Sequence, residues 1–257
     1  MQPYSVVAFN TATASTNKIH EDSVARTLGF RGGLVPGVDV YAYLTQGPVR
    51  EWGRAWLERG TITARFLQPV YDGDVVAVAG TAEGGLALTD PAGTVCATAR
   101  AALPDAAPGL PDVGDWPDVP PTTDPPIAAP EALVPGTAFG LAPHGFRAEH
   151  AGDYLDAVRE VHPLYALERI AHPAWLLRDA NYVLSANVRL GPWIHVESTV
   201  RHHGLVHDGE VVSARATVQK EWEHKGHRFV TLDVLHLADG RPVARTEHTA
   251  IYRPRGT

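Results

Sequence analysis

The chain is organised around two nearby segments, Asn17-Lys18-Ile19-His20-Glu21-Asp22 and, further on, Gly32-Gly33-Leu34-Val35-Pro36-Gly37. The first part is polar and turn-forming, and it holds the one histidine found before position 144. The second part is rich in glycine and proline, which break regular structure, and it leads into an apolar segment, 38–44, that is predicted to be a helix. A histidine just before a glycine-marked helix start is a candidate catalytic residue.

Outward from this stretch, the chain shows one pattern twice. Residues 61–78 and 196–214 each contain two alternating apolar segments joined by an Asp-Gly turn, at Asp72-Gly73 and Asp208-Gly209 respectively. Alternation of apolar and polar residues around such a turn is typical of antiparallel strands. The repetition predicts two related units of structure within one chain.

Helices and final strands repeat in the same order. An apolar helix is predicted over 38–44 in the first copy and over 174–184 in the second, and a last strand over 94–103 and 242–252. With a first strand at 4–9, the order predicts an α+β fold in which each antiparallel sheet wraps around one central helix. Two such sheets side by side would hide an otherwise unpaired edge strand.

The segment between the copies has a different composition. Residues 104–135 contain ten of the 21 prolines, six acidic residues and neither lysine nor arginine. Such a composition favours extended polyproline geometry and predicts a linker that buries no core. We therefore expect an N-terminal unit at 1–103, the linker at 104–135 and a C-terminal unit at 136–257.

Composition excludes several classes of protein. The chain has 257 residues, of which 44% are hydrophobic and 20% charged, as in ordinary globular proteins. No apolar run approaches the ~20 residues that span a bilayer, and the first residues have no signal-peptide pattern, so a cytoplasmic protein without membrane contact is expected. Most of the net charge of −7 lies in the linker, and the absence of a basic surplus argues against nucleic-acid binding. Cys96 is the single cysteine and is expected to be a buried small side chain.

The opening stretch resembles the motif of the MaoC-like dehydratases and (R)-specific enoyl-CoA hydratases. That motif is Asp-x-Asn-Pro-hydrophobic-His-x-Asp, followed by Ala, by Gly-Phe and by His-Gly before the central helix. The matching residues are Asn17, Ile19, His20, Asp22, Ala25, Gly29, Phe30 and Gly37. The motif covers about 25 residues, and the duplication extends the resemblance over most of the chain. The resemblance implies a tandem, or double, hot-dog fold.

The resemblance also implies a mechanism. In the family an aspartate and a histidine activate water for addition to an enoyl thioester, and a backbone N–H at the start of the central helix stabilises the thioester oxygen. Here His20 and the backbone near Gly37 match, but the aspartate position holds Ser15, and Lys18 and Pro36 replace the motif's proline and second histidine. Counting from the Asp-Gly turns, Asp156 takes the place of His20 in the second unit, which we expect to be degenerate. A composite site with Asp156 or His172 reaching across is an alternative.

The candidate site residues have structural interpretations as well. Asn17 either contacts substrate or hydrogen-bonds its own loop, and Ser15 either holds a water or faces solvent. Gly37 allows close approach of the backbone for packing or for a ligand carbonyl, and Val35 and Pro36 beside it are candidate substrate contacts. Arg31 either meets a CoA phosphate or is an ordinary surface arginine.

No metal or separate cofactor is expected, with CoA or phosphopantetheine entering only as part of the substrate. The histidine pairs His202-His203 and His224-x-x-His227 lie at predicted strand ends and turns without the cysteines or carboxylates that would complete a tetrahedral site. Neither a serine-nucleophile elbow nor a phosphate-binding or dinucleotide-binding glycine motif is present.

Three functions follow as hypotheses. The first is a hydratase or dehydratase acting on acyl-CoA or on an acyl-carrier protein, with His20, Asn17 and Ser15 as catalytic candidates. The second is a non-catalytic acyl-thioester binder or a partner subunit, because the aspartate is missing. The third is a hot-dog thioesterase, since the fold alone does not decide chemistry. A homodimer is one expected assembly.

Overall fold

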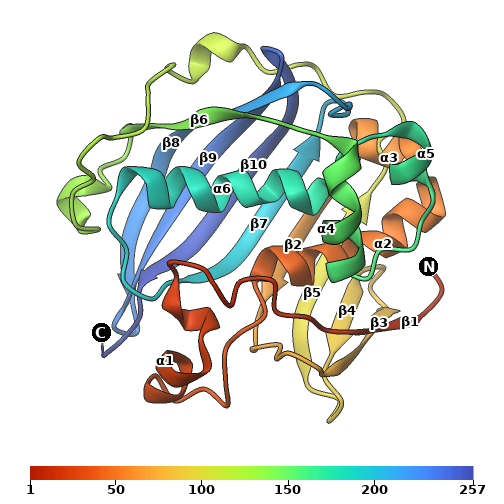
Figure 1. The fold of residues 1–257 in the computed structure, drawn as a ribbon, viewed down its shortest axis with the longest axis horizontal. Coiled ribbons are helices and arrows are strands. Elements are labelled where there is room, and N and C mark those ends of the chain that lie inside the picture. The colour runs from red at the N-terminus through yellow and green to blue at the C-terminus, as the bar shows by residue number, and fades with distance from the viewer. Residues whose placement is uncertain (257) are drawn as a thin grey trace.

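The structure is a computed structural model that describes residues 1–256. Within them, one antiparallel sheet runs through the whole molecule in the order β1-β3-β4-β5-β2-β7-β10-β9-β8-β6 (Figure 1). The strands are β1 Tyr4–Val7, β2 Thr61–Phe66, β3 Val75–Gly80, β4 Leu86–Thr89, β5 Val95–Ala102, β6 Ala138–Gly145, β7 Ile194–His202, β8 Val211–His224, β9 His227–Ala238 and β10 Arg241–Arg253.

The strand order confirms the predicted duplication. From the centre outward, β2-β5-β4-β3-β1 on one side corresponds strand by strand to β7-β10-β9-β8-β6 on the other. The two halves meet where β2 pairs with β7, from Thr61 opposite Arg201 to Arg65 opposite Glu197. The pairing removes two edge strands, as the sequence predicted, and it places residues of both halves next to each other at the centre.

Two long helices lie on one face of the sheet, α2 at Gly37–Trp52 and α6 at Pro173–Asn187 (Figure 1). Both extend beyond the predicted 38–44 and 174–184, because tertiary burial sustains them. In α2, the helix continues through Gly47 and Pro48, and the Gly47 N–H donates to the Tyr4 hydroxyl at 3.1 Å. The helices are therefore core elements whose ends the local sequence underestimates.

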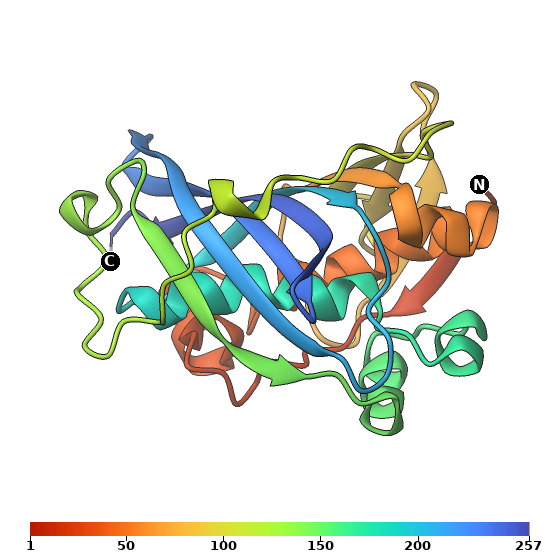
Figure 2. The same ribbon diagram turned by 90° about the horizontal axis from the view of Figure 1, so that it is seen from above.

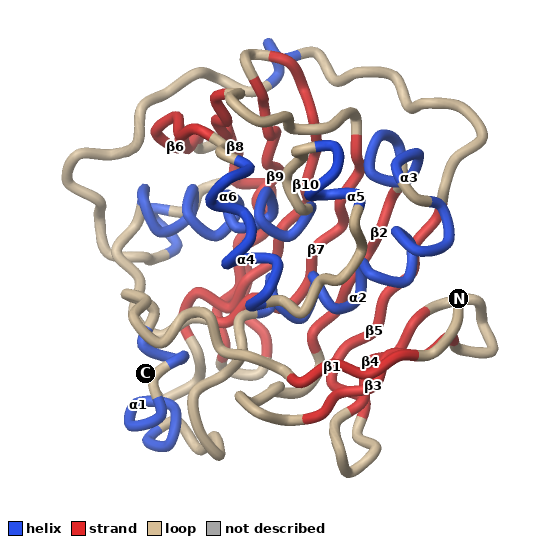
Figure 3. The backbone as a smooth tube through the Cα atoms, turned by 45° about the vertical axis from the view of Figure 1, so that its right-hand side comes forward, coloured by secondary structure: helices blue, strands red, loops and turns tan. Residues whose placement is uncertain are grey.

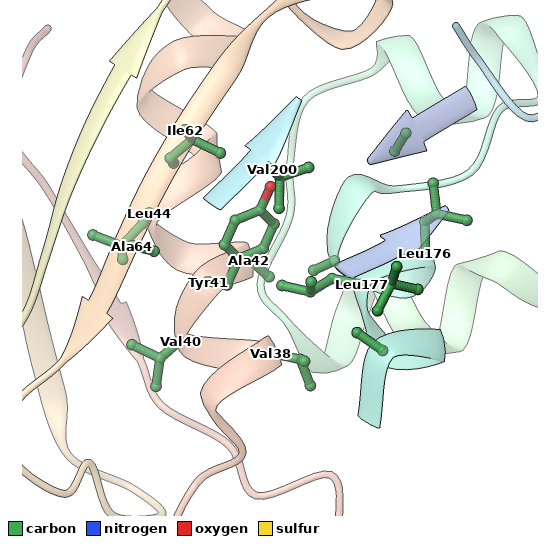
Figure 4. Close-up of a cluster of buried hydrophobic side chains, with 14 of the residues drawn as sticks. Val38, Val40, Tyr41, Ala42, Leu44, Ile62, Ala64, Leu176, Leu177 and Val200 are labelled. Atoms are coloured by element: carbon green, nitrogen blue, oxygen red, sulfur yellow. The ribbon is translucent and has the colours of Figure 1, made fainter. Parts of the chain in front are cut away.

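The hydrophobic core lies between these helices and the sheet and is continuous across both halves. Figure 4 shows Tyr41 of α2 between Ile62 of β2 and Val200 of β7. A side chain of the first half thus packs on a strand of the second. The unit boundaries 1–103 and 136–257 stay a prediction, since one core serves both.

Short helices cover the same face of the sheet and its rim (Figure 3). In chain order, α1 Asp22–Thr27 precedes α2, α3 Arg54–Arg59 follows it, and α4 Ala151–Ala157 and α5 Leu164–Glu168 precede α6. The 3-10 turns are Lys18–His20, Val113–Asp115, Pro130–Ala132 and Ala148–His150, of which the second and third belong to the proline-rich segment.

The proline-rich segment crosses the opposite face of the sheet (Figure 2). Trp116 is only 4% exposed there and packs on Leu235 and Leu237 of β9, and its ring N–H donates to the Asp233 carbonyl at 3.2 Å. The expectation that this segment buries no core was wrong, because its aromatic side chain covers apolar residues on the outer face of β9. No helix within residues 1–256 is long and apolar enough to cross a bilayer.

Candidate active site

The loop before α1 holds His20 by backbone contacts. Asn17 caps the 3-10 turn Lys18–His20, and Ile19 is buried against Ala25 and Leu34. The Asn10 side-chain amide donates to the His20 carbonyl at 2.9 Å. A side chain at Gly33 would place its Cβ 2.2 Å from that carbonyl oxygen, so the glycine before α2 is needed for this packing.

The environment of His20 makes it a neutral base. Its Nδ1 lies 2.7 Å from the Leu34 carbonyl oxygen, which can only accept, so we assign the proton to Nδ1 and the lone pair to Nε2. Burial lowers the pKa of His20 from its usual value, and the bond to Leu34 offsets part of that shift. At neutral pH the ring is therefore uncharged and Nε2 is available to accept a proton.

Asn17 fastens this loop to the second half of the molecule. Its Nδ2 donates to the Trp193 carbonyl at 2.9 Å, and its Oδ1 accepts from the Trp193 N–H at 3.2 Å. The same Nδ2 lies 3.4 Å from His20 Nε2. Asn17 thus contacts the Nε2 atom of the histidine and orients its ring, and a direct contact of Asn17 with substrate stays a prediction.

A cavity of about 680 Å³, the main cavity, lies where the two halves meet. His20 lines it together with the predicted residues Val35, Pro36 and Gly37 at the start of α2. The lining is largely apolar. The remaining lining residues are Asn17, Ile19, Phe30, Leu34, Val40, Phe66, Leu67, Gln68, Pro69, Val70, Asn181, Trp193, Ile194, His195, Val196, Lys225, Phe229 and Ile251.

The start of α2 presents free hydrogen-bond donors at this cavity. Val35 is fixed by donating its N–H to the Val70 carbonyl at 2.8 Å, and Pro36 is the extended N-cap residue. The first N–H groups of a helix have no partner inside the helix, and the Gly37 N–H has no acceptor among residues 1–256. Together with the positive end of the helix dipole, this N–H can stabilise a developing oxyanion.

A second, more polar space of about 330 Å³, the side compartment, adjoins the main cavity. Asn17, His20, Pro36, Asn181 and Trp193 line both spaces. Ser15 and Arg178 line only the side compartment. The Ser15 hydroxyl accepts from the Asn17 N–H at 3.1 Å, so it stabilises the turn beside the histidine.

Carboxylates are absent from the described linings of both spaces. Asp22 accepts from the Gly33 N–H at 2.8 Å and pairs with Arg26, which is a structural role. Asp39 in the first turn of α2 is fully buried and accepts from the Thr11 hydroxyl at 2.6 Å, and burial raises its pKa to about 6. No carboxylate in the described linings therefore takes the place of the aspartate in the family motif.

Three other residues named in the sequence lie outside both linings. Arg31 binds both carboxylate oxygens of Asp74 at 2.7 Å on the surface, and its contact with substrate stays a prediction. Asp156 is exposed on α4. His172 is buried, caps α6 and faces Glu160 at 3.4 Å. A composite site through Asp156 or His172 is thus not formed.

The predicted equivalence of Asp156 with His20 is not confirmed. His20 ends a 3-10 turn and lines the main cavity, whereas Asp156 lies within α4 and is exposed. The equivalence stays a prediction.

Sequence reasoning missed the contributions of the second half. Asn181 comes from α6, and Trp193 and His195 from the start of β7, a region that resembles no motif. A polar residue in an apolar helix was the only signal for Asn181. Among residues 1–256, no group of three or more histidine, cysteine or acidic side chains could hold a metal ion.

Comparison with known proteins identifies the architecture. No protein-family model and no curated protein matches the chain. Among solved structures, a conserved hypothetical protein of Mycobacterium tuberculosis described as having a double hotdog fold matches with a TM-score of 0.62 at 13% identity, over 97% of this chain and 95% of that one. The chain has a double hot-dog fold.

Two other double-length matches agree with this fold. A protein named MaoC-like dehydratase matches with a TM-score of 0.61 at 13% identity, over 98% of both chains. A candidate thioesterase from Novosphingobium aromaticivorans matches with a TM-score of 0.55 at 13% identity, over 98% of this chain and 96% of that one. At such low sequence identity the likeness establishes the double hot-dog fold alone, and any reaction has to be inferred from the geometry of the site.

Proposed function

We propose that this double hot-dog protein hydrates or dehydrates an acyl thioester, carried by CoA or by an acyl-carrier protein. The observation that supports it most is the neutral His20, with its Nε2 lone pair, at a cavity that Gly37, with its unpartnered N–H, also lines. A base and an oxyanion donor at one apolar cavity are what water addition to an enoyl thioester requires.

The chemistry follows from these groups. His20 Nε2 takes a proton from water as the water oxygen bonds to C3 of the enoyl chain. Negative charge moves to the thioester oxygen, where the Gly37 N–H stabilises it. The proton held by His20 then passes to C2, which restores the thioester and the neutral histidine. Dehydration is the reverse.

The main cavity and the side compartment bind different parts of the substrate. The apolar lining of the main cavity suits the acyl chain, and the side compartment suits the more polar arm that leads to the carrier. Arg178 lines both this compartment and an open hollow of about 440 Å³ that Tyr154 also lines, and its guanidinium lies over the Tyr154 ring at 4.8 Å. A cation at this position would attract the phosphates of CoA or phosphopantetheine. The carrier thus enters as part of the substrate.

The test is an assay of hydration with a series of trans-2-enoyl-CoA chain lengths, followed by loss of the conjugated enoyl absorbance. His20→Ala is expected to lower kcat by about 10²–10⁴-fold, the usual contribution of general acid–base catalysis. The matched control is His207→Ala, because His207 is exposed and lines neither space. Absence of turnover at every chain length would reject the proposal.

The lining without carboxylates favours a second candidate, a protein that binds acyl thioesters without hydrating them. Ser15→Asp separates the two, because it restores a carboxylate at the family position. A gain of hydration in this variant from an inactive wild type would identify the protein as a non-catalytic binder. A hot-dog thioesterase would instead release free CoA from saturated acyl-CoAs, which a thiol assay detects.

A further inference from the structure

His195 stands at the start of β7, in the second half, against the start of α2 in the first. It is 6% exposed and lines the main cavity. Its Nδ1 lies 2.8 Å from the point that a Cβ on Gly37 would occupy. The ring therefore abuts Gly37, a residue that lines this cavity and whose N–H has no acceptor among the described residues, and it fits there because Gly37 has no side chain.

The far side of the His195 ring is fixed by a hydrogen-bonded series. Its Nε2 lies 2.8 Å from the Ser198 hydroxyl, which lies 3.0 Å from Nδ1 of His248. By contrast, His195 Nδ1 is buried and has no hydrogen-bond partner among the described residues. A buried polar atom without a partner is unfavourable for folding, and its position beside a cavity points to a ligand that satisfies it.

Two proton arrangements are compatible with this series. In one, His195 Nε2–H donates to Ser198 and the serine donates to His248, which leaves a lone pair on His195 Nδ1. In the other, His248 Nδ1–H donates to Ser198 and the serine donates to His195 Nε2, which leaves a proton on His195 Nδ1. Burial, and next the neighbouring His248, lower the pKa of His195 well below its usual value, with the Glu197 backbone opposing, so both arrangements are neutral.

Burial alone does not single out His195. His236 on β9 is also fully buried, also contacts a hydroxyl, that of Thr246 at 3.0 Å, and also has an unpartnered Nδ1. It lines neither the main cavity nor the side compartment. His236 is thus a matched example of a buried histidine without access to a ligand.

We propose that His195 donates a hydrogen bond from Nδ1–H to the thioester carbonyl oxygen, as a second oxyanion donor beside the Gly37 N–H. The inference rests on the proposed function only in that an acyl thioester is the ligand. A carbonyl oxygen can accept but not donate, so its arrival selects the arrangement with the proton on His195 Nδ1. In that arrangement His248 Nδ1–H donates to Ser198 and the serine donates to His195 Nε2, so both rings are neutral and the carbonyl binds the molecules that already carry the proton on His195 Nδ1.

The experiment measures the carbonyl directly. A saturated acyl-CoA labelled at the thioester carbonyl carbon binds without hydration, and difference infrared spectroscopy gives its C=O stretching frequency in the complex. Donors at the oxygen lower this frequency. The variants are His195→Leu, which removes the donor, His195→Asn, whose amide nitrogen occupies the place of Nδ1, and His236→Gln as the matched control.

The expected result is a lowered frequency in the wild type, in His195→Asn and in His236→Gln, and a return toward the solution value in His195→Leu. In turnover, His195→Leu should lose about 10²–10³-fold in kcat with little change in KM, the loss typical of one oxyanion donor. If His195→Leu does not fold, Ser198→Ala takes its place and should give a partial return of the frequency.

The outcomes separate the two proposals. An unchanged frequency in His195→Leu, or in Ser198→Ala where that variant stands in, with hydration intact in the wild type, overturns the role of His195 alone. A frequency shift that depends on His195, in a wild type that hydrates nothing, supports the role of His195 and rejects the hydratase. A wild type that binds no acyl-CoA rejects both.

Discussion

The contact between Gly37 and His195 predicts an unusual effect of Gly37→Ala. In most helices this replacement is stabilising, by up to about 1 kcal/mol in a helix interior. Here the new Cβ would lie 2.8 Å from His195 Nδ1 and 3.1 Å from its Cβ and Cγ. The ring has little room to retreat, because Phe66 and His248 pack on it with ring centroids 4.5 and 4.4 Å away.

The magnitude follows from the two opposing effects. Overpacking of a core by one carbon costs typically about 1–3 kcal/mol, and the helix preference of alanine returns up to about 1 kcal/mol. The net loss of unfolding free energy should lie between about 0 and 3 kcal/mol, with a central value of about 1–2 kcal/mol. For a chain of this size, that lowers Tm by roughly 2–8 °C.

Chemical denaturation of a double-mutant cycle checks this reasoning. His195→Ala removes two of the three close atoms, so Gly37→Ala should be less destabilising in that background, with a coupling of about 0.5–2 kcal/mol. Stabilisation by Gly37→Ala in the wild type, or an equal loss in both backgrounds, would refute the contact as the cause.

Further predictions concern pH, the linker and the carrier. In the pH profile of kcat/KM, the midpoint of the loss of activity on the acid side should lie below pH 6.5, the ordinary pKa of histidine, because burial lowers the pKa of His20 and its neutral form is active. A midpoint above 6.5 would contradict this. Burial lowers the pKa of three core histidines, His202, His236 and His248, to about 3. Below pH 6.5 the unfolded chain therefore binds more protons than the folded chain, and the free energy of unfolding should fall as pH drops from 6.5 toward 3. Replacing any one of these histidines should make that fall less steep. Trp116→Ala should cost about 3 kcal/mol, as for other buried aromatics, and should speed proteolysis of the linker; unchanged cleavage would mean that the linker is held elsewhere. Arg178→Ala should raise KM for CoA thioesters and weaken its dependence on salt, whereas an unchanged KM would remove phosphate recognition from this residue.

The sequence placed His20 and the residues at the start of α2 in one candidate site through a local motif, and in the structure they line one cavity, while their catalytic roles stay predictions. A local motif suffices for this grouping because its contacts span few residues and need specific types: a histidine, a capping asparagine and glycines. Trp193 and His195 were not identified, because they lie more than 150 positions further on and meet the motif only through the β2–β7 pairing. The linker was misjudged in one respect, since composition does not reveal that Trp116 finds an apolar partner on β9.

The repeated order of strands and helices, the double hot-dog architecture and the position of one histidine before a glycine-marked helix were predictable from the chain alone. These depend on alternation, turn residues and a motif, all of which are local. The tautomer of His20, the lowering of its pKa, the cavity between the halves and the approach of His195 to Gly37 became visible in the folded molecule. Hydrogen bonds and burial arise between segments far apart in the chain, and they are fixed only when the two sheets join.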